Sequence, residues 1–220
     1  MNKLNFVDWK KIDYSEALER QLSIFNNKVS QKLLGNTSIS NDFILCEHNN
    51  VYTLGKHGKD TNMLISEEYL KKINAEVYHI NRGGDITYHG PGQITGYPSL
   101  DLDVLHFGIR DYIYSLEQMV INLMQDYDIR CERLEGATGV WIDANTPRAR
   151  KICAIGVKVS RGITMHGFAL NVNTDLKYFS YINPCGFVDK GVTSMEKELK
   201  EKVDLDTIKQ KLYNHFLQLT

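Results

Sequence analysis

Cys185 is the residue of this sequence whose surroundings best suit covalent chemistry. It stands between a proline and a glycine in the segment NPCGF, residues 183–187, which favours a tight loop that can expose the sulfur at a pocket mouth. For Cys46, Cys131 and Cys153, as for any cysteine, the default expectation is a small buried apolar side chain. No C-x-x-C pair is present, which argues against a zinc ribbon or a redox dithiol.

A glycine-rich segment from Arg82 to Gln93 is the densest signal in the chain, and it reads RGGDITYHGPGQ. Its four glycines and one proline imply sharp backbone turns and the close approach of another group. Polar side chains that can form hydrogen bonds alternate with the glycines. The segment therefore predicts a binding loop that presents backbone N–H groups.

Other interpretations of the glycine-rich segment remain open. It could be a hairpin turn with ordinary surface residues. A phosphate loop is disfavoured, because the spacing matches neither G-x-x-x-x-G-K-[ST] nor G-x-G-x-x-G. A single histidine such as His89 is more often a hydrogen-bonded structural residue than a catalyst, and we expect the structural role here.

A second polar cluster lies in residues 150–173, RKICAIGVKVSRGITMHGFALNVN. Its strand-like alternation surrounds two glycines and carries four basic side chains: Lys151, Lys158, Arg161 and His166. Cys185, His89 and His166 could be considered zinc ligands, but their spacing fits no standard zinc site. No metal is therefore expected.

Helical and strand periodicities indicate the elements that must position these segments. Apolar residues recur every three or four positions over 18–33, 109–124 and 205–216, with Ser15 as a possible cap and Gly35 as a stop for the first helix. Between them lie β-rich runs, mostly separated by turn-forming residues: FILCE, VYTL, AEVYHI, ITYH, QITGYPSLDL, IRCERL, GVWI, KICAIGVKVS and ITMHGFALNVN. The fold class predicted is α+β, with a mixed, mainly antiparallel sheet and helices packed on one side.

The composition of the chain is that of an ordinary soluble globular protein. Its 220 residues suit a single domain over residues 1–220, and a net charge of −1 gives no support for a nucleic-acid partner. No apolar run fits a signal peptide or a membrane helix, so a cytoplasmic protein without a membrane partner is expected. No long apolar stripe is left exposed once the core is assigned, which favours a monomer.

Taken together, these segments resemble the octanoyl-[acyl-carrier-protein]:protein octanoyltransferases of lipoate biosynthesis, also called lipoyl(octanoyl) transferases. The resemblance covers most of the chain, from EHNNVYTLGKHG through RGGDITYHGPGQITGYP, RKICAIGVKVSRG and HGFALNVN to NPCGFVDKGVTS, in that order. Where the family commonly has a proline pair after Glu-His, this chain has Asn49-Asn50, a departure that touches no expected catalytic group.

The resemblance implies the α+β fold of the biotin and lipoate protein ligase catalytic domain. It implies transfer of an octanoyl or lipoyl group from acyl carrier protein to a lysine of a lipoyl domain, in the E2 subunits of 2-oxoacid dehydrogenases and the H protein of glycine cleavage. By match of motif, Cys185 is the nucleophile and Lys151 its catalytic partner. The implied substrate-binding residues are Arg82, Gly83, Gly84, Asp85, Ile86, Thr87, Tyr88, His89, Ala154, Ile155, Gly156, Gly167, Phe168 and Ala169.

The chemistry of acyl transfer needs residues of these types. A free cysteine thiol titrates near about pH 8.5 and is mostly protonated at neutral pH, so a neighbouring lysine would supply the base or the positive charge that makes the thiolate available. Lys151, if desolvated and lowered in pKa, could serve both half-reactions. Lys158 is expected to be a solvated surface cation instead. N–H groups in glycine-rich loops would stabilise the oxyanions.

An octanoyl chain also needs an apolar slot, because burying each methylene contributes about 0.8 kcal/mol. Tyr88, Ile155 and Phe168 flank the matched segments and could line it. Since the donor is already a thioester, the reaction needs no ATP, and no cofactor is expected.

Three other functions remain as alternatives. A lipoate or biotin protein ligase would share the fold but would activate a free acid with ATP and would not rely on a cysteine. An amidotransferase that moves octanoyl between proteins is expected to carry its cysteine elsewhere in the chain. A non-catalytic module that binds carrier proteins would have no reason to keep both Cys185 and Lys151.

Overall fold

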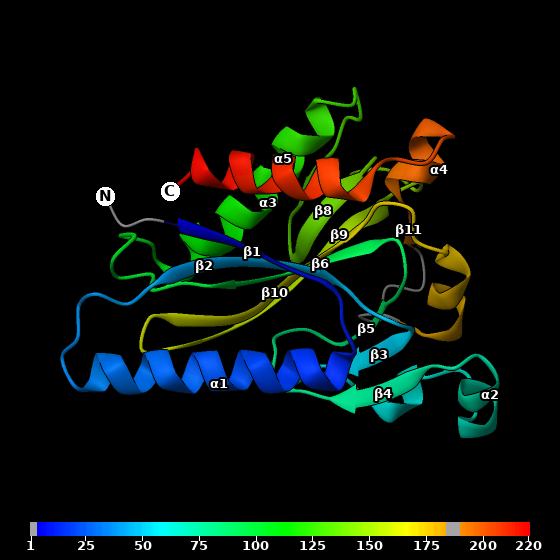
Figure 1. Cartoon of the computed structure of the whole chain (residues 1–220). Helices are drawn as coiled ribbons and strands as arrows, with labels where there is room; N and C mark the ends of the chain where they lie inside the picture. The colour runs from blue at the N-terminus through cyan, green and yellow to red at the C-terminus, as the bar shows by residue number, and fades with distance from the viewer. Residues whose placement is uncertain (1–3, 184–189) are drawn as a thin grey trace.

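The structure, a computed structural model, describes residues 4–183 and 190–220 (Figure 1). In this part of the chain the main sheet has the order β1-β2-β6-β10-β9-β8-β7, and β11 pairs with β9. Its strands are β1 (Leu4–Lys11), β2 (Asn41–Glu47), β6 (Gln93–Ser99), β7 (Glu132–Leu134), β8 (Ala137–Ile142), β9 (Arg150–Ser160), β10 (Ile163–Asn171) and β11 (Gly191–Val192). A smaller sheet has the order β4-β3-β5, with β3 (Val51–Leu54), β4 (Glu76–His79) and β5 (Ile86–His89).

Both sheets are mixed, as the sequence predicts. β1 runs parallel to β2, β4 to β3, and β11 to β9, whereas the other paired strands are antiparallel. The helices are α1 (Tyr14–Leu33), α2 (Glu67–Lys72), α3 (Ile109–Gln125), α4 (Met195–Leu199) and α5 (Leu205–Leu217), with short 3-10 helices η1 (Asp60–Asn62) and η2 (Leu176–Tyr181). The prediction of an α+β fold is confirmed.

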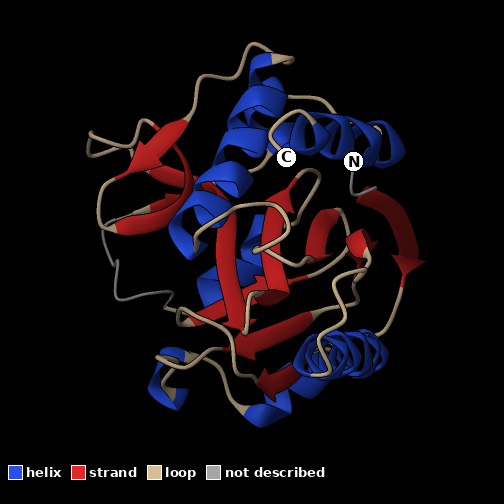
Figure 2. Cartoon of the chain, turned by 90° about the vertical axis from the view of Figure 1, so that its left-hand side faces the viewer, coloured by secondary structure: helices blue, strands red, loops and turns tan. Residues whose placement is uncertain are grey.

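The expectation that the helices pack on one side of the sheet is wrong. Along β2, Phe43 and Leu45 contribute to the large core that includes residues of α3 and α5, whereas Ile44 and Cys46 pack in a separate cluster with Ala17 of α1. Alternate residues of a strand point to opposite faces, so both faces of β2 are buried. Figures 1 and 2 show α1 on one face of the main sheet, with α3 and α5 on the other.

The three helices predicted from periodicity are confirmed, with small changes at their ends. α1 begins at Tyr14, and Asp13 rather than Ser15 is its N-cap residue. α5 begins after Asp204, whose side chain accepts a hydrogen bond of 2.8 Å from the Thr207 N–H. Beyond the last turn of α1, Gly35 adopts a positive φ of 78°, as expected of a helix stop.

The small sheet has an apolar cluster of its own. Tyr52, Leu54, Leu70, Ile86, Tyr88 and Ile182 form it, and aromatic residues of η2 pack against it. β5 carries the middle of the glycine-rich segment, and β6 begins at its last residue, so this segment passes from the small sheet to the main sheet. Among the described helices, none combines the length and the apolar character that crossing a membrane requires.

Candidate active site

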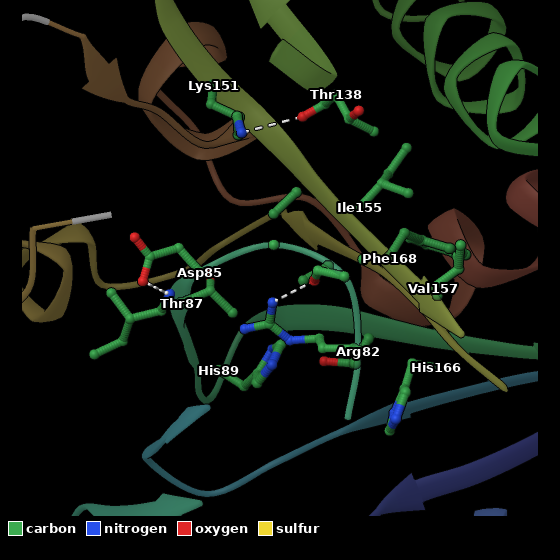
Figure 3. Close-up of a pocket in the computed structure, with 18 of the residues that line it drawn as sticks. Arg82, Asp85, Thr87, His89, Thr138, Lys151, Ile155, Val157, His166 and Phe168 are labelled. Carbon is green, nitrogen blue, oxygen red and sulfur yellow. Dashed lines mark hydrogen bonds between the residues drawn. The ribbon is translucent and has the colours of Figure 1, made fainter. Parts of the chain in front are cut away.

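A cavity of about 630 Å³ lies where the glycine-rich segment meets the main sheet. Residues of both motif segments line it, together with residues of several other elements (Figure 3). From the glycine-rich segment come Arg82, Gly83, Gly84, Asp85, Ile86, Thr87, His89 and Gln93. From β9 and β10 come Lys151, Ala154, Ile155, Gly156, Val157, His166, Gly167, Phe168, Ala169 and Asn171.

The glycine-rich segment lies directly on β9. The N–H of Gly83 donates to the carbonyl oxygen of Val157 at 3.1 Å, and a Cβ added at Gly156 would lie 2.7 Å from the oxygen of Gly83. Gly84 adopts a positive φ of 87°, which an L side chain rarely tolerates. Close backbone contact therefore explains glycine at position 156, and the positive φ explains it at position 84.

Part of the predicted set of exposed N–H groups is already used inside the protein. Besides Gly83, the N–H of Ile86 donates to the Asp85 carboxylate at 2.7 Å. Both oxygens of the Asp85 carboxylate also accept from the side-chain Nδ2 of Asn62, at 3.0 and 2.8 Å. Asp85 thus fixes the turn before β5, and the N–H groups of Gly83 and Ile86 are not free to bind an oxyanion.

Arg82 is a buried cation at the cavity wall. Its Nη2 donates to the carbonyl oxygen of Thr53 at 2.7 Å and to its hydroxyl at 3.0 Å, and its Nη1 donates to the carbonyl oxygen of Gly83 at 2.9 Å. These bonds hold the guanidinium against the small sheet while it faces the cavity.

Tyr88 does not line the cavity, unlike the other predicted binding residues of its segment. Its ring stacks on Tyr178 with centroids 4.8 Å apart, and its hydroxyl donates to the Asn50 amide oxygen at 2.8 Å. Alternation along β5 accounts for this, because Thr87 and His89 then face the cavity while Tyr88 faces the aromatic cluster. The sequence makes Tyr88 one of three candidates for the acyl slot, whereas its side chain packs in the aromatic cluster of the small sheet.

The apolar part of the cavity wall comes from β9 and β10. Phe168 pairs with Ile155, Gly167 with Gly156, and Ala169 with Ala154. A Cβ at Gly167 would collide with the Gly96 carbonyl oxygen of β6. In this wall the large side chains of Ile155 and Phe168 are flanked by residues with small side chains or none: Ala154, Gly156, Gly167 and Ala169. Such a surface can accommodate a slender apolar group.

Three of the described histidines are buried and neutral. Burial lowers the pKa of His89 to about 3, helped by the charge of His48, and lowers that of His48 itself to about 4. The pKa of His166 falls to about 3, first because of burial and then because of Arg82. His89 also bonds to the Gln93 side chain at 2.8 Å through Nδ1. These contacts support the structural role expected of His89.

These histidines should make the protein acid-sensitive. Their folded pKa values lie below the ordinary value near about 6.5, so the unfolded chain takes up protons first, and stability falls as the pH drops from about 6.5 toward about 3. For His166 alone, the loss at pH 5 is on the order of 2 kcal/mol. Thermal unfolding followed between pH 7 and pH 5 should show a falling midpoint.

A His166→Asn variant tests the origin of this acid sensitivity. His166 has a positive φ of 59°, a conformation that asparagine tolerates. The melting midpoint of the His166→Asn variant should therefore depend less steeply on pH than that of the native chain. An identical slope in His166→Asn would contradict the assignment.

Lys151 reaches the cavity from an irregular part of β9. Val140 pairs with Cys153 and Trp141 with Lys151, so Ile152 is an extra residue that forms a bulge. The Lys151 amine donates to the Thr138 carbonyl oxygen at 3.1 Å (Figure 3) and lies 4.6 Å from the centre of the Trp141 ring. A carbonyl oxygen and an aromatic face both favour a protonated amine.

Cys185 lies outside the described residues, so the structure does not test its position. Its flanks are described. The N–H of Asn183 donates to the Asn62 carbonyl oxygen at 2.8 Å, and Lys190, Gly191 and Val192 line the cavity. Val192 of β11 pairs with Lys151 of β9, so the described chain that follows Cys185 in the sequence lies beside the predicted catalytic lysine.

The other three cysteines match the default expectation of buried thiols. Cys46 and Cys153 are buried, and Cys131 is half-buried. Burial raises the pKa of the Cys131 thiol to about 12 and that of the other two further. None of the three is thus a ready nucleophile at neutral pH. Among the described residues, no group of three or more histidine, cysteine or acidic side chains is placed to hold a metal ion.

Sequence reasoning missed cavity residues that come from other elements. These are Tyr14, Ile80, Thr95, Tyr97, Ile109, Ile113, Gly136, Ala137, Thr138, Trp141, Phe179, Lys190, Gly191 and Val192. Ile109 and Ile113 belong to the apolar stripe of α3, which the periodicity assigns to the core. Thr138 and Trp141 lie in a run that signals only a strand, so no local pattern distinguished them.

Comparisons with known proteins agree on one family. The model of the lipoyl protein ligase A/B catalytic domain matches residues 13–217. A protein of Bacteroides thetaiotaomicron named octanoyltransferase is 55% identical over 210 residues, which cover 96% of this chain and 92% of that protein.

Two solved structures share the fold at low sequence identity. A bipartite lipoate protein ligase from Thermoplasma acidophilum, described with its E2 lipoyl domain, has a TM-score of 0.69 and 15% identity, covering 99% of this chain and 84% of its own. The biotin protein ligase of Aquifex aeolicus has a TM-score of 0.52 and 12% identity, covering 100% of this chain and 69% of its own. The predicted likeness to the biotin and lipoate ligase fold is confirmed.

Proposed function

This chain belongs to the octanoyltransferases of the lipoyl protein ligase A/B catalytic domain family, and on that basis we propose how it transfers its acyl group. Octanoyl, or lipoyl, would pass from acyl carrier protein to Cys185 as a thioester and then to a lysine of a lipoyl domain. One observation carries the proposal: Lys151 lines the cavity and pairs with Val192 of β11, the strand that follows the Cys185 segment in the sequence.

The first half-reaction exchanges one thioester for another. The Cys185 thiolate attacks the octanoyl carbonyl, a carbon–sulfur bond forms, and the carrier thiol leaves with the bonding electrons. The ammonium of Lys151 would stabilise the thiolate and then protonate the leaving thiolate. Because both sides are thioesters, this step is nearly balanced in free energy.

In the second half-reaction, the acceptor lysine attacks the Cys185 thioester. Its amine must be neutral, so a base takes a proton while the carbon–nitrogen bond forms and the Cys185 thiolate leaves. After protonating the carrier thiolate, Lys151 is the neutral amine that can take this proton, which returns it to its starting form. One lysine therefore accounts for the protons of both half-reactions.

The cavity fits the acyl part of this substrate. Its volume of about 630 Å³ is that of a small-molecule site, and Ile155 and Phe168 give it apolar walls. The predicted binding residues on β9 and β10 all line it, as do those of the glycine-rich segment apart from Tyr88. Their contact with the acyl chain and the thioester is part of the proposal.

The acceptors proposed are the lipoyl domains of 2-oxoacid dehydrogenase E2 subunits and the glycine cleavage H protein. The name of the Thermoplasma structure pairs its ligase with an E2 lipoyl domain, which supports an acceptor of that kind here. We also propose that residues 1–220 act as one catalytic domain, as a monomer that light scattering would reveal. The free thiols of the three described cysteines support a location in the reducing cytoplasm.

An acyl-enzyme trapping experiment tests the proposed function. The purified chain is incubated with octanoyl-acyl carrier protein without ATP, and intact and peptide masses are measured. We expect an octanoyl adduct on Cys185 that hydroxylamine removes and that apo lipoyl domain consumes. A chain that forms no adduct, or that transfers octanoyl only when ATP is added, would be a ligase or a binding module instead.

A further inference from the structure

A buried carboxylate lies behind the strand that holds Lys151. Glu117 of α3 is 7% exposed. Its Oε1 accepts a hydrogen bond of 3.0 Å from the Gly139 N–H of β8, and its Oε2 accepts one of 2.9 Å from Nε of Arg133 on β7. A buried charge is costly unless it is paired and hydrogen-bonded, and these two donors satisfy that requirement.

Gly139 is the residue against which the Lys151 side chain lies. It adopts a φ of 126°, and a Cβ there would stand 2.6 Å from the Cys153 carbonyl oxygen and 3.3 Å from Cε of Lys151. The residue before it supplies the carbonyl oxygen of Thr138, and Trp141, two residues after it, supplies the aromatic face. These contacts of Lys151 are therefore centred on the Thr138–Gly139 peptide, whose N–H binds Glu117.

Arg133 fixes the carboxylate from the opposite side. Its Nη2 donates at 3.0 Å both to the Tyr114 carbonyl oxygen and to the Gln118 side chain, and its guanidinium lies 3.5 Å from the centre of the Tyr114 ring. Glu117 and Arg133 thus join α3, β7 and β8 behind the bulge of β9. No residue of this pair was singled out by the sequence.

We propose that Glu117 is a positioning residue for acyl transfer, which acts by holding Gly139 and thereby the contacts that orient the Lys151 amine. The proposal rests on the proposed function, since it takes Lys151 as the partner of Cys185. Glu117 touches neither substrate nor the reacting atoms. Its effect is exerted through the backbone of β8.

A Glu117→Gln variant changes this arrangement with little change in shape. The Gly139 N–H and Arg133 Nε bind different oxygens of the carboxylate, and in glutamine one of these oxygens is replaced by an NH₂ group, which must then face a donor. A displaced lysine amine should slow acylation by octanoyl-acyl carrier protein by roughly tenfold to a hundredfold in kcat, with KM for the donor nearly unchanged.

The pH profile of Cys185 alkylation by iodoacetamide gives a readout that a purely structural role would not move. With the lysine cation displaced, the thiolate should form at a higher pH, so the midpoint of alkylation should rise in Glu117→Gln. Peptide mass spectrometry assigns the product to Cys185. Replacing the exposed Glu135 by glutamine removes a charge from the same region and should leave the rate and the midpoint unchanged.

A double-mutant cycle completes the test. In a Lys151→Ala background, Glu117→Gln should cause no further loss of acylation rate, because its effect passes through the lysine. Should Glu117→Gln fail to fold, Arg133→Gln is measured instead, and its midpoint should shift in the same direction. A native rate and midpoint in the folded variant, or additive losses in the cycle, would overturn the proposal. Absence of the Cys185 adduct in the native chain, or full activity of Lys151→Ala, would overturn the proposed function instead.

Discussion

Replacing Lys151 by alanine should slow acylation of Cys185 by roughly 10²- to 10⁴-fold, the range expected for removal of a general acid–base group. Under the proposed mechanism, the variant lacks both the ammonium that would stabilise the thiolate and the proton donor for the departing carrier thiol. Rapid-quench measurement of a single turnover with octanoyl-acyl carrier protein gives this rate directly. The transfer from pre-formed acyl-enzyme to the apo lipoyl domain should be slowed as well.

Lys158 is a matched control on the same strand. Its amine lies 4.7 Å from the centre of the Phe25 ring of α1, and Lys158 is not among the residues that line the cavity. Lys158→Ala should cost on the order of 1 kcal/mol of stability through the lost cation–π contact and should acylate at the native rate. The reverse pattern, a slow Lys158 variant and a fast Lys151 variant, would reassign the base.

Replacing Cys185 by serine should abolish turnover, with a loss of at least about 10³-fold. A hydroxyl has a far higher pKa than a thiol, so the lysine proposed as the catalytic partner could not provide a useful fraction of the anion. Steady-state transfer to a lipoyl domain measures the loss, and hydroxylamine-labile octanoyl should be absent from the protein. An unchanged melting midpoint would show that the substitution acts on the chemistry.

Cys131→Ser is the control for that substitution. The Cys131 thiol is half-buried, and burial raises its pKa to about 12, so it should not exchange with a thioester. This variant should keep native turnover and the native adduct. If turnover survived in Cys185→Ser but vanished in Cys131→Ser, the nucleophile would have to be reassigned.

The sequence predicted those elements that have a strong period of their own. Apolar repeats identified α1, α3 and α5, and alternation or β-branched content identified most strands. β1 was missed because LNFVDWKK, which among the described strands pairs with β2 alone, mixes charged and apolar residues. α2 and α4 have six and five residues, too few to show a helical period.

The site was predictable only where its residues are close in sequence. The motif segments carry Arg82, Lys151 and Phe168, which the fold brings to one cavity. Thr138 and Trp141 contact Lys151 through strand pairing, and Glu117 of α3 binds the neighbouring Gly139; no local pattern signals such contacts. The error over Tyr88 has a similar cause, since which face of β5 meets the cavity depends on how two sheets are joined.

The separate apolar cluster of the small sheet has a consequence for how a ligand acts on the whole molecule. The cavity wall is shared between the glycine-rich segment, which leads into the small sheet, and β9 and β10 of the main sheet. Each cluster can lose structure by its own opening, and amide hydrogen exchange reports each opening separately. An acyl chain bound across both walls adds its binding free energy to each of them. If the acyl group binds as proposed, the two sheets should exchange as a single cooperative unit when substrate is present.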